Sequence, residues 1–247
     1  MAAKRKQRRR SRARQQVFGF RTHGGKRHGA GRKPKGERAE VRHESRAGID
    51  RRTPLLVTVA FERRLGYLRR HKVLKALRSC LLQANGRFDT RFCEYSLQGD
   101  HAHFMVETTN RETLHKAMTG FSVRLARRLN KLRPPAASEP RRVFRDRYHH
   151  RALTTPRAVR NGLSYVLNNS TKHAGQHLNR YQASYVDVFS SAGSFNGWKR
   201  QHRQFVPRAG PAETGVSLPR TWRLTTGWRK AGLIGTDESP RVIRRSG

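Results

Sequence analysis

The stretch His101-Ala102-His103-Phe104-Met105-Val106-Glu107 has the alternation of a half-buried β-strand. Side chains two residues apart in a strand project from the same face, so Ala102, Phe104 and Val106 should face a hydrophobic core. His101 and His103 then lie side by side on the opposite face. Gln98-Gly99-Asp100 precedes the stretch and is typical of a hairpin loop, which joins it to a strand within residues 87–97. The stretch therefore predicts a β-hairpin whose second strand carries two imidazoles.

The neighbouring segments extend this hairpin into an α+β fold. A nonpolar, β-branched run at 54–61 predicts a buried strand, and a helical period from Leu68 ends at Asn85-Gly86. Leucines and phenylalanine recur every three or four residues over 114–132, and Pro134-Pro135 ends that helix. A strand over 143–153 and a helix capped by Thr155 and Pro156 follow. The first six elements match a ferredoxin-like split βαβ arrangement, an antiparallel sheet with two helices on one face. We expect the other face to be free to meet a ligand.

The charge of the chain points to a polyanionic partner. Its 247 residues include 55 Lys and Arg against 16 Asp and Glu, a formal net charge of +39. Nucleic acid and an anionic membrane surface are the usual partners of such a chain. The membrane is the weaker candidate, because no stretch approaches the roughly 18 consecutive apolar residues of a spanning helix and no signal peptide is evident. We expect a protein of the cytosol or nucleus and assign it to the cytoplasm. Cys80 and Cys93 are expected to be buried free thiols.

Composition divides the chain into three parts. Residues 1–46 contain 17 Lys and Arg, three Glu and few large hydrophobic residues, which predicts a disordered basic DNA-binding arm. Glycine and proline alternate with cations at 24–36, where the sequence resembles an AT-hook, and Arg32, Lys33 and Lys35 are its candidate DNA contacts. A generic tail that only releases counterions remains the alternative. Residues 50–175 form the predicted catalytic domain, and residues 176–247 form a partly docked extension that contains all three tryptophans.

Two features of the central part suggest chemistry. Paired imidazoles can ligate a divalent metal, although two of twelve histidines could also fall two residues apart by chance. On the helix that begins at Pro156, Tyr165 lies roughly 130° from the packing stripe, the stripe being Val159, Leu163 and Val166. Gly162 and Asn169 share the tyrosine's side, and we expect Gly162 to leave room for an approaching chain. A half-exposed structural tyrosine is the alternative.

Together these features resemble the single-tyrosine HUH transposases, specifically the REP-associated branch. The resemblance rests on His101-Ala102-His103, on Val143-Phe144-Arg145-Asp146-Arg147-Tyr148-His149 and on the segment 154–169, and it spans roughly residues 50–175. It implies that His101 and His103 hold Mg²⁺ or Mn²⁺ and that Tyr165 attacks single-stranded, hairpin-forming DNA to leave a 5′-phosphotyrosine. Cleavage and strand transfer by a transposase, acting as a monomer or a homodimer, would follow.

Three further residues have candidate roles. Asn169 stands where some relatives use a glutamine, one methylene longer, so either direct ligation or a water bridge is open. Arg147 is a candidate DNA contact. Glu107 shares the histidine face and would be a distant electrostatic helper or, more simply, a solvated charge at the end of the strand.

A second function remains open on the same scaffold. Non-catalytic nucleic-acid-binding modules also combine a split βαβ sheet with a basic surface. An RNA-recognition module would place exposed aromatic residues on the central strands, whereas this sequence places histidines there.

Overall fold

The computed structural model describes residues 48–133, 142–169, 186–200 and 209–238. All of these residues belong to one unit, Ser45–Gly247. The predicted basic arm, with Arg32, Lys33 and Lys35, lies outside the described residues.

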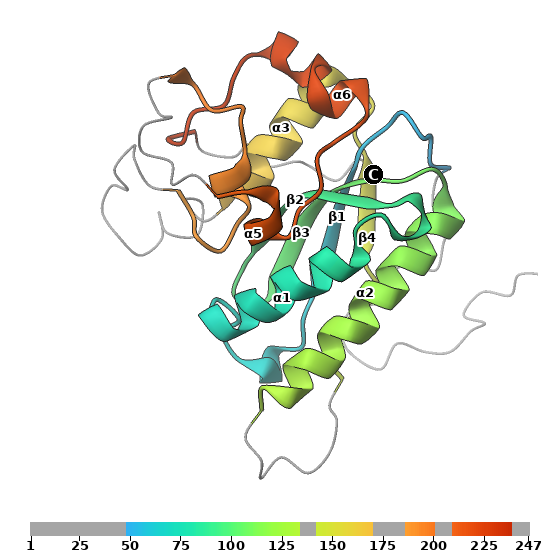
Figure 1. Cartoon of the computed structure of the whole chain (residues 1–247), viewed down its shortest axis with the longest axis vertical. Helices are drawn as coiled ribbons and strands as arrows, with labels where there is room; N and C mark the ends of the chain where they lie inside the picture. The colour runs from blue at the N-terminus through green and yellow to red at the C-terminus, as the bar shows by residue number, and fades with distance from the viewer. Residues whose placement is uncertain (1–47, 134–141, 170–185, 201–208, 239–247) are drawn as a thin grey trace, which may run out of the picture. The chain divides into compact units, whose positions relative to one another are not determined.

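A four-stranded antiparallel sheet forms the centre, in the strand order β2-β3-β1-β4 (Figure 1). Its strands are β1 (Leu55–Ala60), β2 (Arg91–Leu97), β3 (His101–Glu107) and β4 (His149–Ala152). Helices α1 (His71–Ala84) and α2 (Arg111–Lys131) pack on one face, and this confirms the predicted ferredoxin-like α+β class. The side chains of Ala102, Phe104 and Val106 point into this helical layer, as their parity in the strand predicts.

Two predicted strands are shorter than expected. The segment before β2 forms a 3₁₀ turn, η2 (Arg87–Asp89), in which Phe88 and Asp89 have φ values of 52° and 49°. Before β4, only Phe144 makes a single bridge, to Phe61. A further 3₁₀ turn, η1 (Arg63–Leu65), follows β1.

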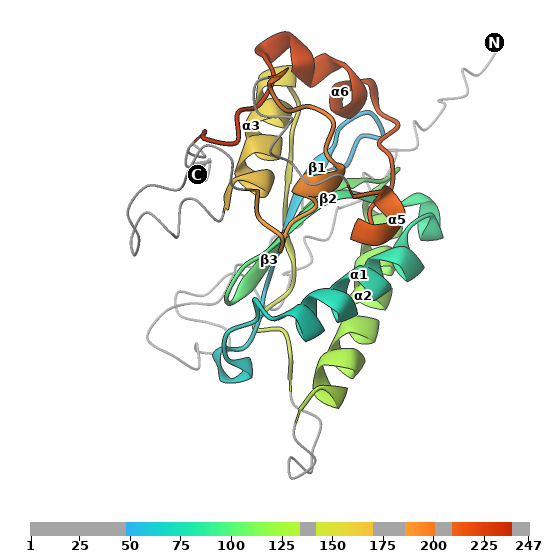
Figure 2. The same cartoon turned by 60° about the vertical axis from the view of Figure 1, so that its left-hand side comes forward.

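The other face of the sheet is covered, which corrects the expectation of an open face. Helix α3 (Pro156–Leu167) lies on this side, opposite α1 and α2 (Figure 2). A second hydrophobic core fills the space beneath α3, and from the sheet it includes Leu56, Cys93 and Met105. Because these nonpolar side chains stand at positions that alternate with the first core, the sheet buries both faces over part of its area.

The residues after 185 complete this second core. They form the short elements η3 (Ala192–Ser194), α5 (Pro211–Thr214), α6 (Trp222–Thr225) and η5 (Gly227–Ala231). Trp198 and Trp228 are buried in the core, whereas Trp222 is 53% exposed. The three-part division of the chain stays a prediction, but this segment packs on the same body as the sheet.

Glu107 joins the sheet to this segment. Its carboxylate accepts hydrogen bonds from the backbone N–H groups of Arg220 and Thr221, at 2.7 and 2.8 Å, and from the Thr221 hydroxyl at 2.7 Å. Both expected roles of Glu107, a solvated charge and an electrostatic helper, are therefore replaced by a structural one.

Cys80 and Cys93 are buried and free, as predicted. Across the described ranges, no helix combines the length and the nonpolar character needed to cross a membrane.

Candidate active site

The tyrosine helix α3 places its phenol against a histidine of β3. The Thr155 hydroxyl caps α3 by accepting a hydrogen bond from the Ala158 N–H at 3.1 Å, and Pro156 occupies the first turn, both as predicted. Since Val159, Leu163 and Val166 pack into the second core, the neighbouring face of the helix turns toward the sheet. There the Tyr165 Oη lies 3.2 Å from His103 Nε2, and the two ring centroids are 4.8 Å apart. The structure therefore brings the phenol of Tyr165 next to the histidine pair, as the predicted roles of these residues require.

The two histidines lie side by side and each is held at Nδ1. Their ring centroids are 4.7 Å apart. His101 Nδ1 is 2.6 Å from the Asp100 carboxylate, and His103 Nδ1 is 2.9 Å from the Thr58 hydroxyl. Hydrogen bonding at one ring nitrogen orients the other toward a metal, and a carboxylate partner raises its basicity. The arrangement therefore presents the two Nε2 atoms as candidate metal ligands.

Sequence reasoning missed both of these supporting residues. The loop pattern assigns Asp100 only to the hairpin loop, although an acidic residue directly before a strand histidine indicates a partner for its imidazole. The hydrogen bond to His101 lowers the pKa of Asp100 and keeps the carboxylate ionised. Thr58 lies opposite His103 in the antiparallel pairing of β1 with β3. That partnership depends on strand register and has no local sequence signal.

The surroundings of Asn169 are compatible with its expected role as a third polar group at a metal site. The described residues include no cluster of three or more His, Cys, Asp or Glu side chains that could bind a metal. Asn169 is 1% exposed, and neither atom of its amide has a hydrogen-bond partner among the residues that the structure describes. A buried amide without partners costs stability unless a ligand, ion or water satisfies it. The unsatisfied amide of Asn169 is therefore compatible with its expected role as a further ligand, directly or through water.

The surroundings of Tyr165 work against ionisation of the phenol. Burial raises the pKa of Tyr165 above its usual value near 10. A nucleophilic phenolate would therefore need added positive charge close to its oxygen.

The expected role of Gly162 is wrong. A Cβ at this position would lie 2.8 Å from Leu153 Cδ1 and 3.1 Å from Met105 Cε. The glycine therefore allows α3 to approach the sheet closely and provides no clearance for DNA.

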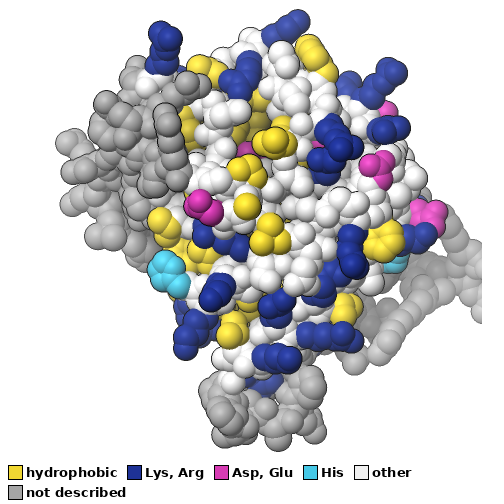
Figure 3. Space-filling model, viewed as in Figure 1, with side chains coloured by type: hydrophobic (Ala, Val, Ile, Leu, Met, Phe, Trp, Pro, Cys, Tyr) yellow, Lys and Arg dark blue, Asp and Glu magenta, His cyan; other side chains and the backbone are white. Residues whose placement is uncertain are grey.

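Arg147 lies apart from this group. Its side chain is exposed in the loop before β4, and its backbone N–H donates to the Asp146 carboxylate at 2.6 Å. In the described structure no hydrogen bond or ion pair connects its guanidinium to the histidines or the tyrosine. Lysine and arginine side chains are also spread over the face that carries α1 and α2 (Figure 3).

A protein family and a solved structure are similar to this chain. Residues 55–169 match the family model described as IS200-like transposase. No curated protein matches the chain. A solved structure of a REP-associated tyrosine transposase bound to a REP hairpin is 13% identical, with a TM-score of 0.47 over 61% of this chain and 82% of that chain. The segment matched by the family model contains both histidines, the tyrosine and Asn169. Over residues 55–169, this chain is therefore similar to the family of IS200-like transposases.

Proposed function

We propose that this protein cleaves and rejoins single-stranded DNA with Tyr165 as nucleophile, through a 5′-phosphotyrosine, with Mg²⁺ or Mn²⁺ held by His101 and His103. One observation carries the proposal. The Tyr165 Oη lies 3.2 Å from His103 Nε2, a nitrogen that its Thr58 partner orients as a ligand. A tyrosine that only filled space would not need to meet the metal-binding edge of an imidazole.

The reaction is a transesterification. The phenol oxygen forms a bond to phosphorus, the bond between phosphorus and the 3′-oxygen breaks, and the 3′-oxygen takes up a proton while the phenol loses one. The energy of the phosphodiester is kept in the covalent link, so the 3′-OH of another strand can reverse the step and join DNA. A bound divalent ion would polarise the phosphate and favour the phenolate.

Residues of the chain hold the reacting groups in place for this chemistry. Asp100 and Thr58 fix the two imidazole rings, and the packing of α3 fixes the phenol beside them. Asn169 would bind the ion directly or through water. Because approach geometry contributes strongly to such reactions, this rigid support is a substantial part of the catalyst.

The substrate we propose is a hairpin-forming single strand, on the basis of the sequence resemblance to the REP-associated branch. Net charge of +39 supports a nucleic-acid partner, and Arg147 with the arm residues Arg32, Lys33 and Lys35 would contact phosphates. Action as a monomer or a homodimer and a cytoplasmic location remain predictions.

A covalent-adduct assay tests the proposal. Hairpin DNA labelled at its 3′ end is incubated with the protein and Mn²⁺, and the products are separated on a denaturing gel. We expect an adduct with the wild-type protein, none with Tyr165→Phe and none after chelation of the metal. Tyr67→Phe is the matched control, because Tyr67 is 65% exposed and lies outside the site.

The opposite result favours the alternative function. If wild type and Tyr165→Phe bind the hairpin equally and neither forms an adduct, the protein is a non-catalytic nucleic-acid-binding module on the same scaffold.

A further inference from the structure

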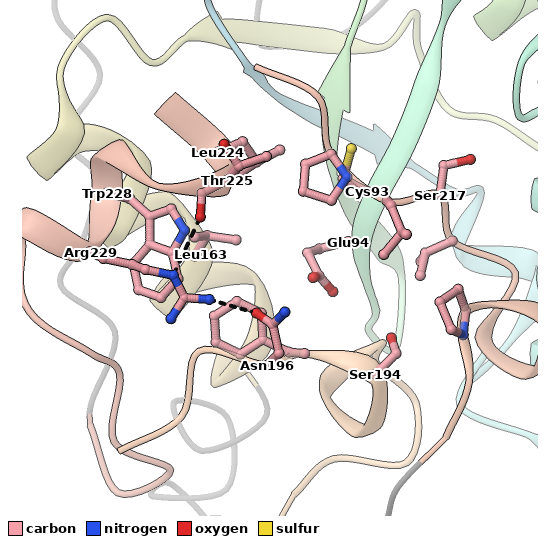
Figure 4. A pocket seen from close by; sticks show the side chains of 15 residues that line it. Cys93, Glu94, Leu163, Ser194, Asn196, Ser217, Leu224, Thr225, Trp228 and Arg229 are labelled. Atoms are coloured by element: carbon pink, nitrogen blue, oxygen red, sulfur yellow. Dashed lines mark hydrogen bonds between the residues drawn. The ribbon is translucent and has the colours of Figure 1, made fainter. Parts of the chain in front are cut away.

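A pocket separate from the histidine and tyrosine pair lies between β2, α3 and the segment after residue 185 (Figure 4). Its volume is about 240 Å³. Nonpolar walls come from α3 and the later segment and include Leu163, Phe195, Val216 and Trp228. Pockets that hold whole drug-sized ligands occupy about 300–1,000 Å³, so this one suits a single ring system.

A buried carboxyl group points into this pocket (Figure 4). Glu94 of β2 is 9% exposed, and its Oε2 accepts a hydrogen bond from the Ser191 hydroxyl at 2.5 Å. Its other oxygen, Oε1, has no hydrogen-bond partner within the described parts of the chain. Burial raises the pKa of Glu94 to about 8. At neutral pH the group is therefore mainly a neutral acid, with an O–H that needs an acceptor.

A guanidinium stands at the rim of the pocket. Arg229 donates from Nη2 to the Asn196 side chain at 2.8 Å and from Nε to the Thr225 carbonyl at 3.3 Å. Its charge lies 4.8 Å from the centre of the Trp228 ring. These contacts hold the guanidinium in place, and its Nη1 donates to no residue that the structure describes. The pocket thus offers two donors, one inside and one at the rim.

Two further cations adjoin residues that line the pocket. The Arg91 guanidinium donates to the carbonyl of Leu218, a residue that lines the pocket, and Arg220 directly follows Pro219, another lining residue. Cations beside a base-sized cavity suit a strand whose backbone stays outside while one base enters.

We propose that this pocket binds one unpaired base of the DNA strand, a base with ring carbonyl groups that accept hydrogen bonds from Glu94 and Arg229. The proposal deepens the proposed function and rests on DNA being the partner. It assigns to the segment after residue 185 a part in reading the strand.

The test compares two single strands of equal charge. The probes are fluorescein-labelled dT12 and a twelve-unit abasic strand, titrated in EDTA so that no cleavage contributes. Three variants are compared with the wild-type protein. Glu94→Leu removes the acid, Glu94→Gln keeps a donor and an acceptor in the same space, and Ser217→Trp narrows the pocket without changing the carboxyl group.

We expect Glu94→Leu and Ser217→Trp to weaken dT12 binding by about 5- to 100-fold, the range for loss of one base contact. Binding of the abasic strand should stay within about twofold, and Glu94→Gln should bind both probes about as the wild-type protein does. Unchanged dT12 affinity in Ser217→Trp, or equal losses for both probes, would overturn the proposal. If thermal melting shows that Glu94→Leu does not fold, Ser217→Trp decides alone.

The two proposals can fail separately. The titration needs neither metal nor Tyr165, whereas the adduct assay depends on both. A base-specific effect without an adduct would leave the pocket as a binding site and remove the catalytic proposal.

Discussion

Replacing Tyr165 by phenylalanine should strengthen metal binding while it abolishes strand cleavage. In the structure the phenol occupies His103 Nε2, the nitrogen that a divalent ion would use. One nitrogen lone pair cannot serve both partners, so the ion must displace the phenol. Phenylalanine keeps the ring but makes no hydrogen bond, which removes the competition.

The size of the effect follows from the hydrogen bond. An intramolecular hydrogen bond contributes about 0.5–1.5 kcal/mol net, equivalent to about 2- to 10-fold in affinity. At 3.2 Å the contact is at the long end of the range, which favours the smaller value. Mn²⁺ affinity is measured by calorimetry or electron paramagnetic resonance on wild type, Tyr165→Phe and the exposed control Tyr67→Phe. Weaker Mn²⁺ binding by Tyr165→Phe would show that the phenol supports the ion, and equal binding in all three proteins would place the metal elsewhere.

Three further outcomes follow from particular contacts. Asp100→Asn should weaken Mn²⁺ binding by about 10- to 100-fold, because the carboxylate that orients His101 loses its charge. An unchanged Mn²⁺ affinity, measured in the same way as for Tyr165→Phe, would contradict this role of Asp100. The raised pKa of Glu94, about 8 against 4.5 in the unfolded chain, means that the folded state keeps a proton that the unfolded state releases. Stability should therefore fall as pH rises from 4.5 to 8, by on the order of 5 kcal/mol, and Glu94→Gln should flatten the denaturation profile over that window. Gly162→Ala should destabilise the fold by about 1–3 kcal/mol in urea denaturation, since the added methyl group would lie 2.8 Å from Leu153 Cδ1 and 3.1 Å from Met105 Cε, and a neutral result would require α3 to shift without cost.

Local signals in the sequence predict much of the framework. Alternation along β3 separates the core residues from the histidines, because the pleat of a strand allows only two faces. Thr155 and Pro156 locate the first turn of α3, because a cap and a fixed φ act within one turn. These features depend on residues close in sequence, so periodicity and capping rules can identify them.

The rest of the site depends on contacts that no local rule contains. Thr58 supports His103 only because β1 and β3 pair in one register. Glu107 is buried because a loop more than a hundred residues later supplies three donors to it. The cover over the second face was missed for the same reason. Alternation along β1 and β3 identifies only the side chains that face the first core. Leu56 and Met105 face the other way, and their partners come from α3 and the segment after it.

The position of Tyr165, the proposed nucleophile, therefore depends on residues beyond the segment 55–169 that the family model matches. Arg160 of α3 donates to the Leu233 carbonyl at 3.0 Å and to the Glu238 carboxylate at 2.7 Å. Asn168, which caps the helix, donates to the Gly235 carbonyl at 2.8 Å. These bonds hold the outer side of α3 while the sheet holds the inner side. Because α3 also carries Tyr165, the later segment helps to hold the helix that brings the phenol to His103.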